Sequence, residues 1–307
     1  MKLLDPNIAA PDIRYNNIQK PIGCNNPPDL AIRHVKELYS LTSHILDSGF
    51  REKIKLNFAA CYSEMYFAAS LMERSKIDVT HPSDEGADFY LKNLDCWAEV
   101  VTATDGKEGN PNTIPQPKFN EVQSYPEEQL VLRLSSVFCD KAKKLKEEDI
   151  KKGRIDENQP IIICISGGWL TERLPMHPEG GYPVIAKTLL PIGDFVLWIN
   201  TKTNTITSHE YKYREGMSKK TNAGQKMIST DFFLNAEFNH INAVVYSWAN
   251  AANPIERSKW GCDFYTVHNP FAKNKLPLGF IRCGIEYPVT ANEKSFTMDP
   301  PIDHERS

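Results

Sequence analysis

The sequence lacks most of the local signals that would assign it to a disulfide-rich, zinc-binding or membrane class. Its seven cysteines stand singly, and neither a Cys-x-x-Cys nor a Cys-x-x-His spacing occurs. An odd number of scattered cysteines argues against a disulfide framework and against a structural zinc site. No apolar run approaches the length of a membrane span, and the first residues form no signal-peptide hydrophobic region. We therefore expect a cytoplasmic protein that does not associate with membranes.

Internal repeats, low-complexity tracts and the Gly-x-Ser-x-Gly motif of serine hydrolases are missing as well. The chain also has no excess of positive charge, because it contains 36 Lys and Arg residues and 39 Asp and Glu residues. Contact with nucleic acid would therefore need a local basic face. The most basic stretch is expected to be a loop, and its cations are Lys212, Arg214, Lys219, Lys220 and Lys226. This loop is either only solvated or contacts phosphates, and the sequence leaves both interpretations open.

What the chain does contain is a lysine at a position where a predicted helix should be apolar. The helix begins at Pro126, with acidic residues in its first turn. Its buried stripe is formed by Leu130, Leu134, Val137 and Leu145. The missing member of this stripe is Lys141, which at about 100° per residue points within roughly 20° of Leu130. Lys141 either snorkels from the helix edge or is held inside a cleft.

Glu64 raises the same question on a second predicted helix, over residues 51–74. The central apolar stripe of that helix consists of Ile54, Phe58, Cys61, Met65, Ala68 and Met72. Glu64 lies beside this stripe, with apolar residues around it on the helical wheel. A carboxylate placed against the core is costly unless it is paired or bound to a metal. Glu64 therefore either pairs with an arginine, caps a backbone group, or belongs to a functional site.

Two further carboxylates lie on a predicted β-hairpin. Residues 86–91 and 96–104 are rich in strand-forming residues, and an Asn/Asp cluster between them indicates a turn. Alternation places Asp88 on one face of the first strand and Glu99 on one face of the second. Carboxylates on adjacent strands can converge on one Mg²⁺, which prefers oxygen ligands and keeps several waters. The alternative is that Asp88 is an ordinary turn residue and Glu99 an edge-strand charge, although the neighbours of Glu99 look buried.

The order of these motifs resembles a known family. A helix with Glu64 is followed by Gly-x-Asp-Phe at 86–89, Trp-x-Glu-Val-Val at 97–101, a long helix, and a strand at 160–165. This order over about residues 50–167 resembles the restriction-endonuclease-like core of the PD-(D/E)XK nuclease superfamily. The resemblance implies a helix, three strands, a second helix and a fourth strand.

The resemblance also implies roles for individual residues. Asp88 and Glu99 match the positions that bind Mg²⁺ or Mn²⁺, and Glu64 matches a helix glutamate that many members carry and that can contact the metal. The lysine that should follow Glu99 by two residues is replaced by Val101. Some members move this lysine to the following helix, and Lys141 is positioned for that role.

We therefore expect an α/β fold: a restriction-endonuclease-like core with a central mixed sheet flanked by helices and elaborated at both ends. An irregular and helical segment (1–50) precedes the core (51–167), and a C-terminal elaboration (168–307) packs on the core in the same domain. The expected activity is metal-dependent phosphodiester hydrolysis of nucleic acid, with DNA favoured. The candidate contacts with nucleic acid are Gln129, Arg133, Lys219 and Lys220.

Two alternatives stay open. In the first, the chain is a catalytically degenerate nuclease fold that binds nucleic acid or protein, which Val101 supports. In the second, it is an unrelated α/β enzyme whose Asp88 and Glu99 are structural. The sequence also leaves the oligomeric state open, a homodimer included.

Overall fold

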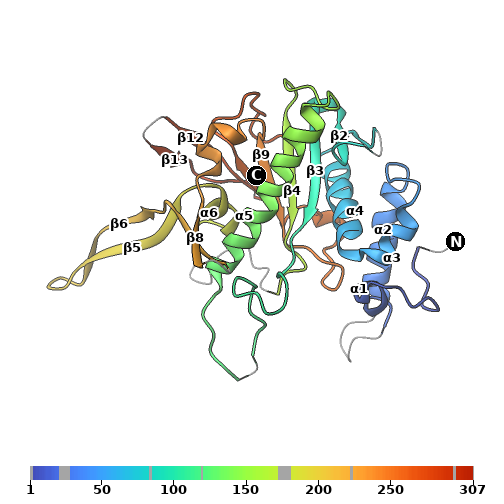
Figure 1. The fold of residues 1–307 in the computed structure, drawn as a ribbon, viewed down its shortest axis with the longest axis horizontal. Helices are drawn as coiled ribbons and strands as arrows, with labels where there is room; N and C mark the ends of the chain where they lie inside the picture. Colours follow the sequence, from blue (N-terminus) through green and yellow to red (C-terminus); the bar gives the residue numbers. More distant parts are fainter. Residues whose placement is uncertain are drawn as a thin grey trace.

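Eight strands form one mixed sheet at the centre of the protein, in the order β1-β2-β3-β4-β9-β10-β11-β14. Helices cover both faces of this sheet, with α1 to α4 on one side and α5 and α6 on the other (Figure 1). The computed structural model describes residues 3–20, 28–82, 85–118, 120–171, 181–221, 224–292 and 295–306.

The helices vary from one turn to five. The α-helices are α1 (Ile13–Asn17), α2 (Pro28–Thr42), α3 (Phe50–Leu56), α4 (Phe58–Glu73), α5 (Glu127–Lys144) and α6 (Val184–Leu189). A π-helical segment, η2 (Leu145–Ile150), continues α5, and the 3-10 turns are η1 (Lys92–Leu94), η3 (Phe232–Leu234), η4 (Ala236–Phe238) and η5 (Arg257–Lys259). Among the described helices, none combines the length and apolar character needed to cross a membrane.

The strands of the large sheet come from both halves of the chain. They are β1 (Val79–Thr80), β2 (Phe89–Leu91), β3 (Cys96–Thr102), β4 (Ile161–Ser166), β9 (Ala243–Ser247), β10 (Tyr265–His268), β11 (Ile285–Tyr287) and β14 (Ile302–Asp303). Three separate hairpins pair β5 (Ile192–Asn200) with β6 (Thr205–Tyr213), β7 (Gly216–Thr221) with β8 (Gly224–Ser229), and β12 (Val289–Ala291) with β13 (Phe296–Met298).

The centre of the sheet is parallel and its first edge is antiparallel. Strands β1, β2 and β3 pair antiparallel, whereas β3, β4 and β9 run parallel to one another. Successive side chains of a β-strand point to opposite faces of the sheet, so β3 and β4 contribute side chains to two separate hydrophobic cores. Ala98 and Ile162 pack under α2 and α4, while Ile161 and Ile163 pack under α5 and α6. The parallel crossover from β3 to β4 runs through α5, as such connections require.

The predicted helix over residues 51–74 is wrong as a single helix. It is divided at Asn57, whose extended backbone (φ −146°, ψ 72°) ends α3. The Asn57 side chain then accepts a hydrogen bond from the Ala60 N–H at 3.3 Å and caps α4. The apolar stripe continues across this break, which is why periodicity alone predicted one helix.

The basic stretch predicted as a loop is also different in the structure. Lys219, Lys220 and Lys226 lie on the β7–β8 hairpin, where Lys219 pairs directly with Lys226 across the strands. Arg214 is half-buried and pairs with Glu127 at 3.4 Å. The stretch is therefore an ordered, mostly exposed ribbon, and Arg214 belongs to its attachment to α5.

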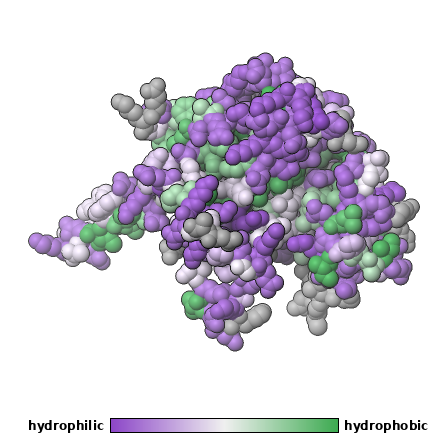
Figure 2. Space-filling model, in the orientation of Figure 1, coloured by the Kyte–Doolittle hydropathy of each residue, from purple (hydrophilic) through white to green (hydrophobic). Residues whose placement is uncertain are grey.

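The β5–β6 hairpin projects away from the rest of the fold (Figure 1). Apolar side chains gather on this hairpin, as the space-filling view shows (Figure 2). The exposed ones are Phe195, Leu197, Trp198, Ile199 and Ile206. The hairpin therefore carries a large exposed apolar surface.

Candidate functional site

Lys141 and Glu99 form a direct ion pair between helix α5 and strand β3. Glu99 lies on the β3 face that α5 covers, and its side chain is only 1% exposed. The Lys141 ammonium donates a hydrogen bond to the Glu99 Oε1 atom, and the Lys144 Nζ atom lies 3.6 Å from the same oxygen. The structure thus places Lys141 facing the sheet.

The environment of this pair keeps the lysine charged. Burial lowers the pKa of the Lys141 ammonium, but the attraction and hydrogen bond of Glu99, together with the Asp88 and Glu64 carboxylates, outweigh burial, so that the pKa is raised. The second carboxylate oxygen of Glu99, Oε2, is buried and has no hydrogen-bond partner among the described residues. A buried carboxylate oxygen without a partner costs free energy, so this atom is a natural position for a further ligand.

Asp88 stands directly before β2, next to Glu99 on the neighbouring strand. Phe89 pairs with Ala98 in the ladder, and the Asp88 Oδ2 atom accepts a hydrogen bond from the Val100 N–H at 2.7 Å. Burial, followed by repulsion from the Glu99 carboxylate, raises the pKa of Asp88 to about 6. Asp88 and Glu99 are therefore close enough to compete for the same positive charge.

Glu64 reaches the site from helix α4. It lines a pocket of about 70 Å³ together with Asp88, and the other lining residues include Asp47, Lys53, His81 and Gly86. Burial, and then the Asp88 carboxylate, raises the pKa of Glu64 to about 8. With this pKa, the Glu64 carboxyl group holds a proton at neutral pH when no ion is bound.

The four predicted residues thus fall into two groups. Glu64 and Asp88 line the pocket, whereas Glu99 and Lys141 are paired with each other and are not among its lining residues. Within the described part of the chain, no group of three or more His, Cys, Asp or Glu side chains is placed to hold a metal ion.

The donor set nevertheless suits a hard cation that takes few protein ligands. Mg²⁺ is commonly held by one or two carboxylates together with waters and substrate phosphates. Asp88 and Glu99 supply two carboxylates that repel each other, and the Glu99 Oε2 atom lacks a partner. These two residues fit such an ion, and Glu64 stands beside them.

The structure brings together only two of the four residues predicted to contact nucleic acid. Arg133 and Lys219 line one cavity with Lys107, whereas Gln129 and Lys220 are not among its lining residues. Val101, at the position where the resemblance expects a lysine, is partly buried and packs against the core on the α5 side. The expected strand lysine would therefore share the face of Glu99.

Sequence reasoning missed several residues near the site. Lys144 follows Lys141 by three positions on the same helix, so helical spacing could have identified it. Asp47, Lys53 and His81 reach the pocket from turns and a helix whose sequences carry no corresponding signal.

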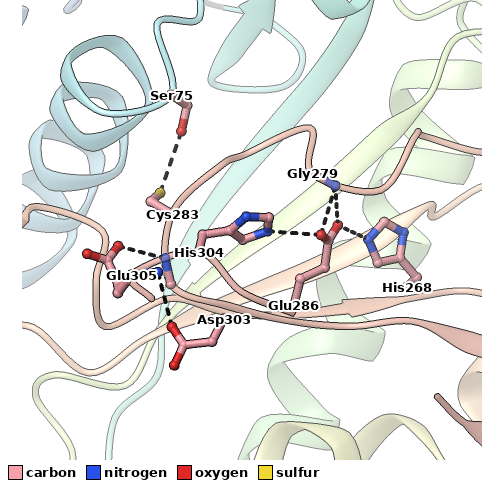
Figure 3. A network of polar contacts seen from close by, with 9 residues as sticks. Ser75, His268, Gly279, Cys283, Glu286, Asp303, His304 and Glu305 are labelled. Atoms are coloured by element: carbon pink, nitrogen blue, oxygen red, sulfur yellow. Dashed lines mark hydrogen bonds and ion pairs between the residues drawn. The ribbon is translucent and has the colours of Figure 1, made fainter. Parts of the chain in front are cut away.

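A second polar cluster was also missed, at the far end of the sheet. The Glu286 carboxylate is contacted by His268 Nε2 at 2.6 Å and by His304 Nε2 at 3.1 Å, and it accepts a hydrogen bond from the Gly279 N–H at 2.8 Å. Figure 3 shows the two imidazoles on either side of the carboxylate. His268 ends β10, and its ring contacts Glu286.

Comparison with protein-family models, curated proteins and solved structures finds no match to this chain.

Proposed function

We propose that this protein hydrolyses phosphodiester bonds of nucleic acid, with DNA as the favoured substrate and Mg²⁺ or Mn²⁺ as the cofactor. The observation that carries the proposal is the buried Glu99–Lys141 pair beside Asp88. Charged groups placed against a core with perturbed pKa values are candidates for a functional site. Here two carboxylates and a lysine meet between the hairpin and the helix that follows it.

The order of elements supports the proposal. Helix α4 precedes β1, β2 and β3, then comes helix α5, and β4 joins β3 in parallel. The resemblance to the restriction-endonuclease-like core implies this order of elements, and it matches Asp88 and Glu99 to the metal-binding positions. Asp88 directly precedes β2 and Glu99 lies on β3, so the antiparallel pairing of these strands brings the two carboxylates together.

Asp88 and Glu99 would hold the metal ion, and Glu64 stands close enough to contribute. When bound, the ion would lower the pKa of its water and shield the charge of the phosphate. Lys141 would face the negative charge that grows on the phosphate oxygens, where a fixed ammonium is most effective. Without the ion, burial and the Asp88 carboxylate raise the pKa of Glu64 to about 8. The positive charge of a bound ion would displace the Glu64 proton, so that Glu64 could contact the ion or orient its water.

One observation favours a second function, a binding module without catalysis. Lys141 already occupies Oε1 of Glu99, and the strand position expected to hold a lysine is Val101. A fold that lost its catalysis would keep such a pair for stability. The two functions differ in whether the buried pair opens to admit an ion.

Cleavage assays separate the two. Wild type should cleave single- or double-stranded DNA or RNA with Mg²⁺ or Mn²⁺, and Glu99→Gln should abolish cleavage while keeping the fold. Lys141→Ala should lower the rate by roughly 10²- to 10³-fold, the usual loss when one charge-stabilising group is removed. Val101→Lys in the Lys141→Ala background should recover part of the rate, because position 101 shares the face of Glu99.

A purified wild-type protein that binds one of these nucleic acids but cleaves none of them would establish the binding module instead.

A further inference from the structure

A second cavity, the Lys107–Arg133–Lys219 cavity, lies beside helix α5 and has a volume of about 330 Å³. Its three cations come from three segments: the loop after β3, helix α5 and the β7–β8 hairpin. Its neutral polar lining consists of Asn110, Asn112, Thr113 and Ser136. Among the described residues that line it there is no carboxylate, so its charge is of one sign.

Hydrogen bonds between these segments hold the cavity walls in place. The Asn112 side chain donates to the Lys220 carbonyl at 2.7 Å and accepts from the Lys220 N–H at 3.0 Å. The Arg133 Nε atom donates to the Thr104 carbonyl at 2.7 Å. The long loop is thereby fastened to the hairpin on one side, and α5 to the end of β3 on the other.

Within the described residues, the cations of the cavity have no carboxylate partner. No carboxylate in the described part of the chain lies within 4.0 Å of Lys107, Arg133 or Lys219 as an ion pair. Lys219 also stands directly opposite Lys226 in the β7–β8 ladder. Like charges at opposed positions destabilise a hairpin, and a bound anion would offset this repulsion.

The cavity lies nearer the start of helix α5 than the proposed reaction centre does. Arg133 and Lys141 are eight residues apart on α5, which corresponds to about 12 Å along the helix. Thr104, which Arg133 contacts, follows Glu99 by five residues at the end of β3.

We infer that the Lys107–Arg133–Lys219 cavity binds a backbone phosphate of the nucleic acid, away from the bond that is cleaved. The inference rests on the proposed function for its substrate class. Three cations with hydroxyl and amide donors suit a phosphate diester, and such contacts fix the register of a strand without reading its sequence. The cavity would therefore position the strand, while Asp88, Glu99 and Lys141 act on it.

The test measures binding without cleavage. In the Asp88→Asn background, the affinity for a fluorescein-labelled DNA duplex is measured by anisotropy from 50 to 200 mM NaCl. Lys219→Gln should weaken binding roughly threefold to tenfold, equally for unrelated sequences, and should lower the slope of log affinity against log salt by about 1. Lys202→Gln, on the tip of the β5–β6 hairpin, removes the same charge outside the cavity and should change neither quantity.

Arg133→Gln is a second variant for the same binding measurement. Its melting temperature is first compared with that of the wild type, because Arg133 also contacts Thr104 and the substitution could affect the fold. A Lys219→Gln protein that binds DNA with unchanged affinity and salt slope would overturn the inference. The inference would also be overturned if inorganic phosphate raised the melting temperature of the protein while the protein bound neither DNA nor RNA. Failure of wild type to cleave, with binding still dependent on Lys219, would overturn the nuclease proposal and leave the phosphate site standing.

Discussion

Removal of the Lys141 charge should destabilise the fold, because Glu99 would remain buried with a poorer partner. Lys141→Met keeps the length of the apolar stem and removes only the ammonium group. Glu99 is 1% exposed and Lys141 is 26% exposed. Breaking a fully buried ion pair by removing one partner costs about 3–5 kcal/mol.

Two features reduce that figure here. Lys141 retains part of its exposure to solvent, and Lys144 stays 3.6 Å from the same Glu99 oxygen. We therefore expect Lys141→Met to lower the free energy of unfolding by about 2–3 kcal/mol at pH 7. Glu99→Gln removes the buried charge itself, so the double variant should recover most of the loss, with a coupling energy of about 1–3 kcal/mol.

The assay is urea unfolding of the wild type, both single variants and the double variant. Lys143→Met, on the exposed face of the same helix, is the matched control and should change stability by less than about 0.5 kcal/mol. A Lys141→Met protein as stable as this control would show that the buried ion pair is not what holds Lys141 against the sheet.

Three further outcomes follow from the charges. Burial and then Asp88 raise the pKa of Glu64 from 4.5 to about 8, so between these pH values the folded state holds a proton that the unfolded chain has released. The free energy of unfolding should therefore fall by roughly 3 kcal/mol from pH 5 to 7.5, as measured by urea unfolding. The Glu64→Gln variant should lack this decline. Burial raises the pKa of Glu286, but hydrogen bonds from His268, Gly279 and His304 outweigh it and lower that pKa below its ordinary 4.5; its contribution should be lost only as the pH falls below about 4.5, and acid unfolding of Glu286→Gln should lack that component. Millimolar Mg²⁺ should raise the melting temperature of the wild type but not of Asp88→Asn, by mass action on the folded state, and equal responses of both proteins in scanning fluorimetry would argue against a metal at this carboxylate.

Periodicity predicted the local elements near the site but not their breaks. The stripe through Leu130 and Leu134 identified α5, and it also marked Lys141 as a residue facing inward. Alternation along β3 placed Glu99 in the same way. The break at Asn57 was not predicted, because the apolar stripe continues through it and only the backbone of one residue departs from the helix.

Contacts between segments that are distant in the chain could not be predicted from the sequence. The Lys107–Arg133–Lys219 cavity joins a loop, a helix and a hairpin, and no spacing relates them. The sequence of the β7–β8 hairpin predicts a loop, because lysine and glycine disfavour strands. Its attachment to Asn112 is a tertiary contact that the sequence does not indicate. The Glu286 cluster likewise joins His268 and His304 across 36 residues of sequence, through the pairing of β10 and β14 with β11.

The most direct test of the central claim is the single-turnover rate at which one DNA duplex is cleaved in Mg²⁺. Three proteins are compared: wild type, Asp88→Asn, and Asp95→Asn, which alters an exposed carboxylate in the turn of the same hairpin. The account predicts metal-dependent cleavage by wild type and by Asp95→Asn, and none by a folded Asp88→Asn protein. Cleavage by Asp88→Asn at the wild-type rate would contradict the assignment of the reaction to this site.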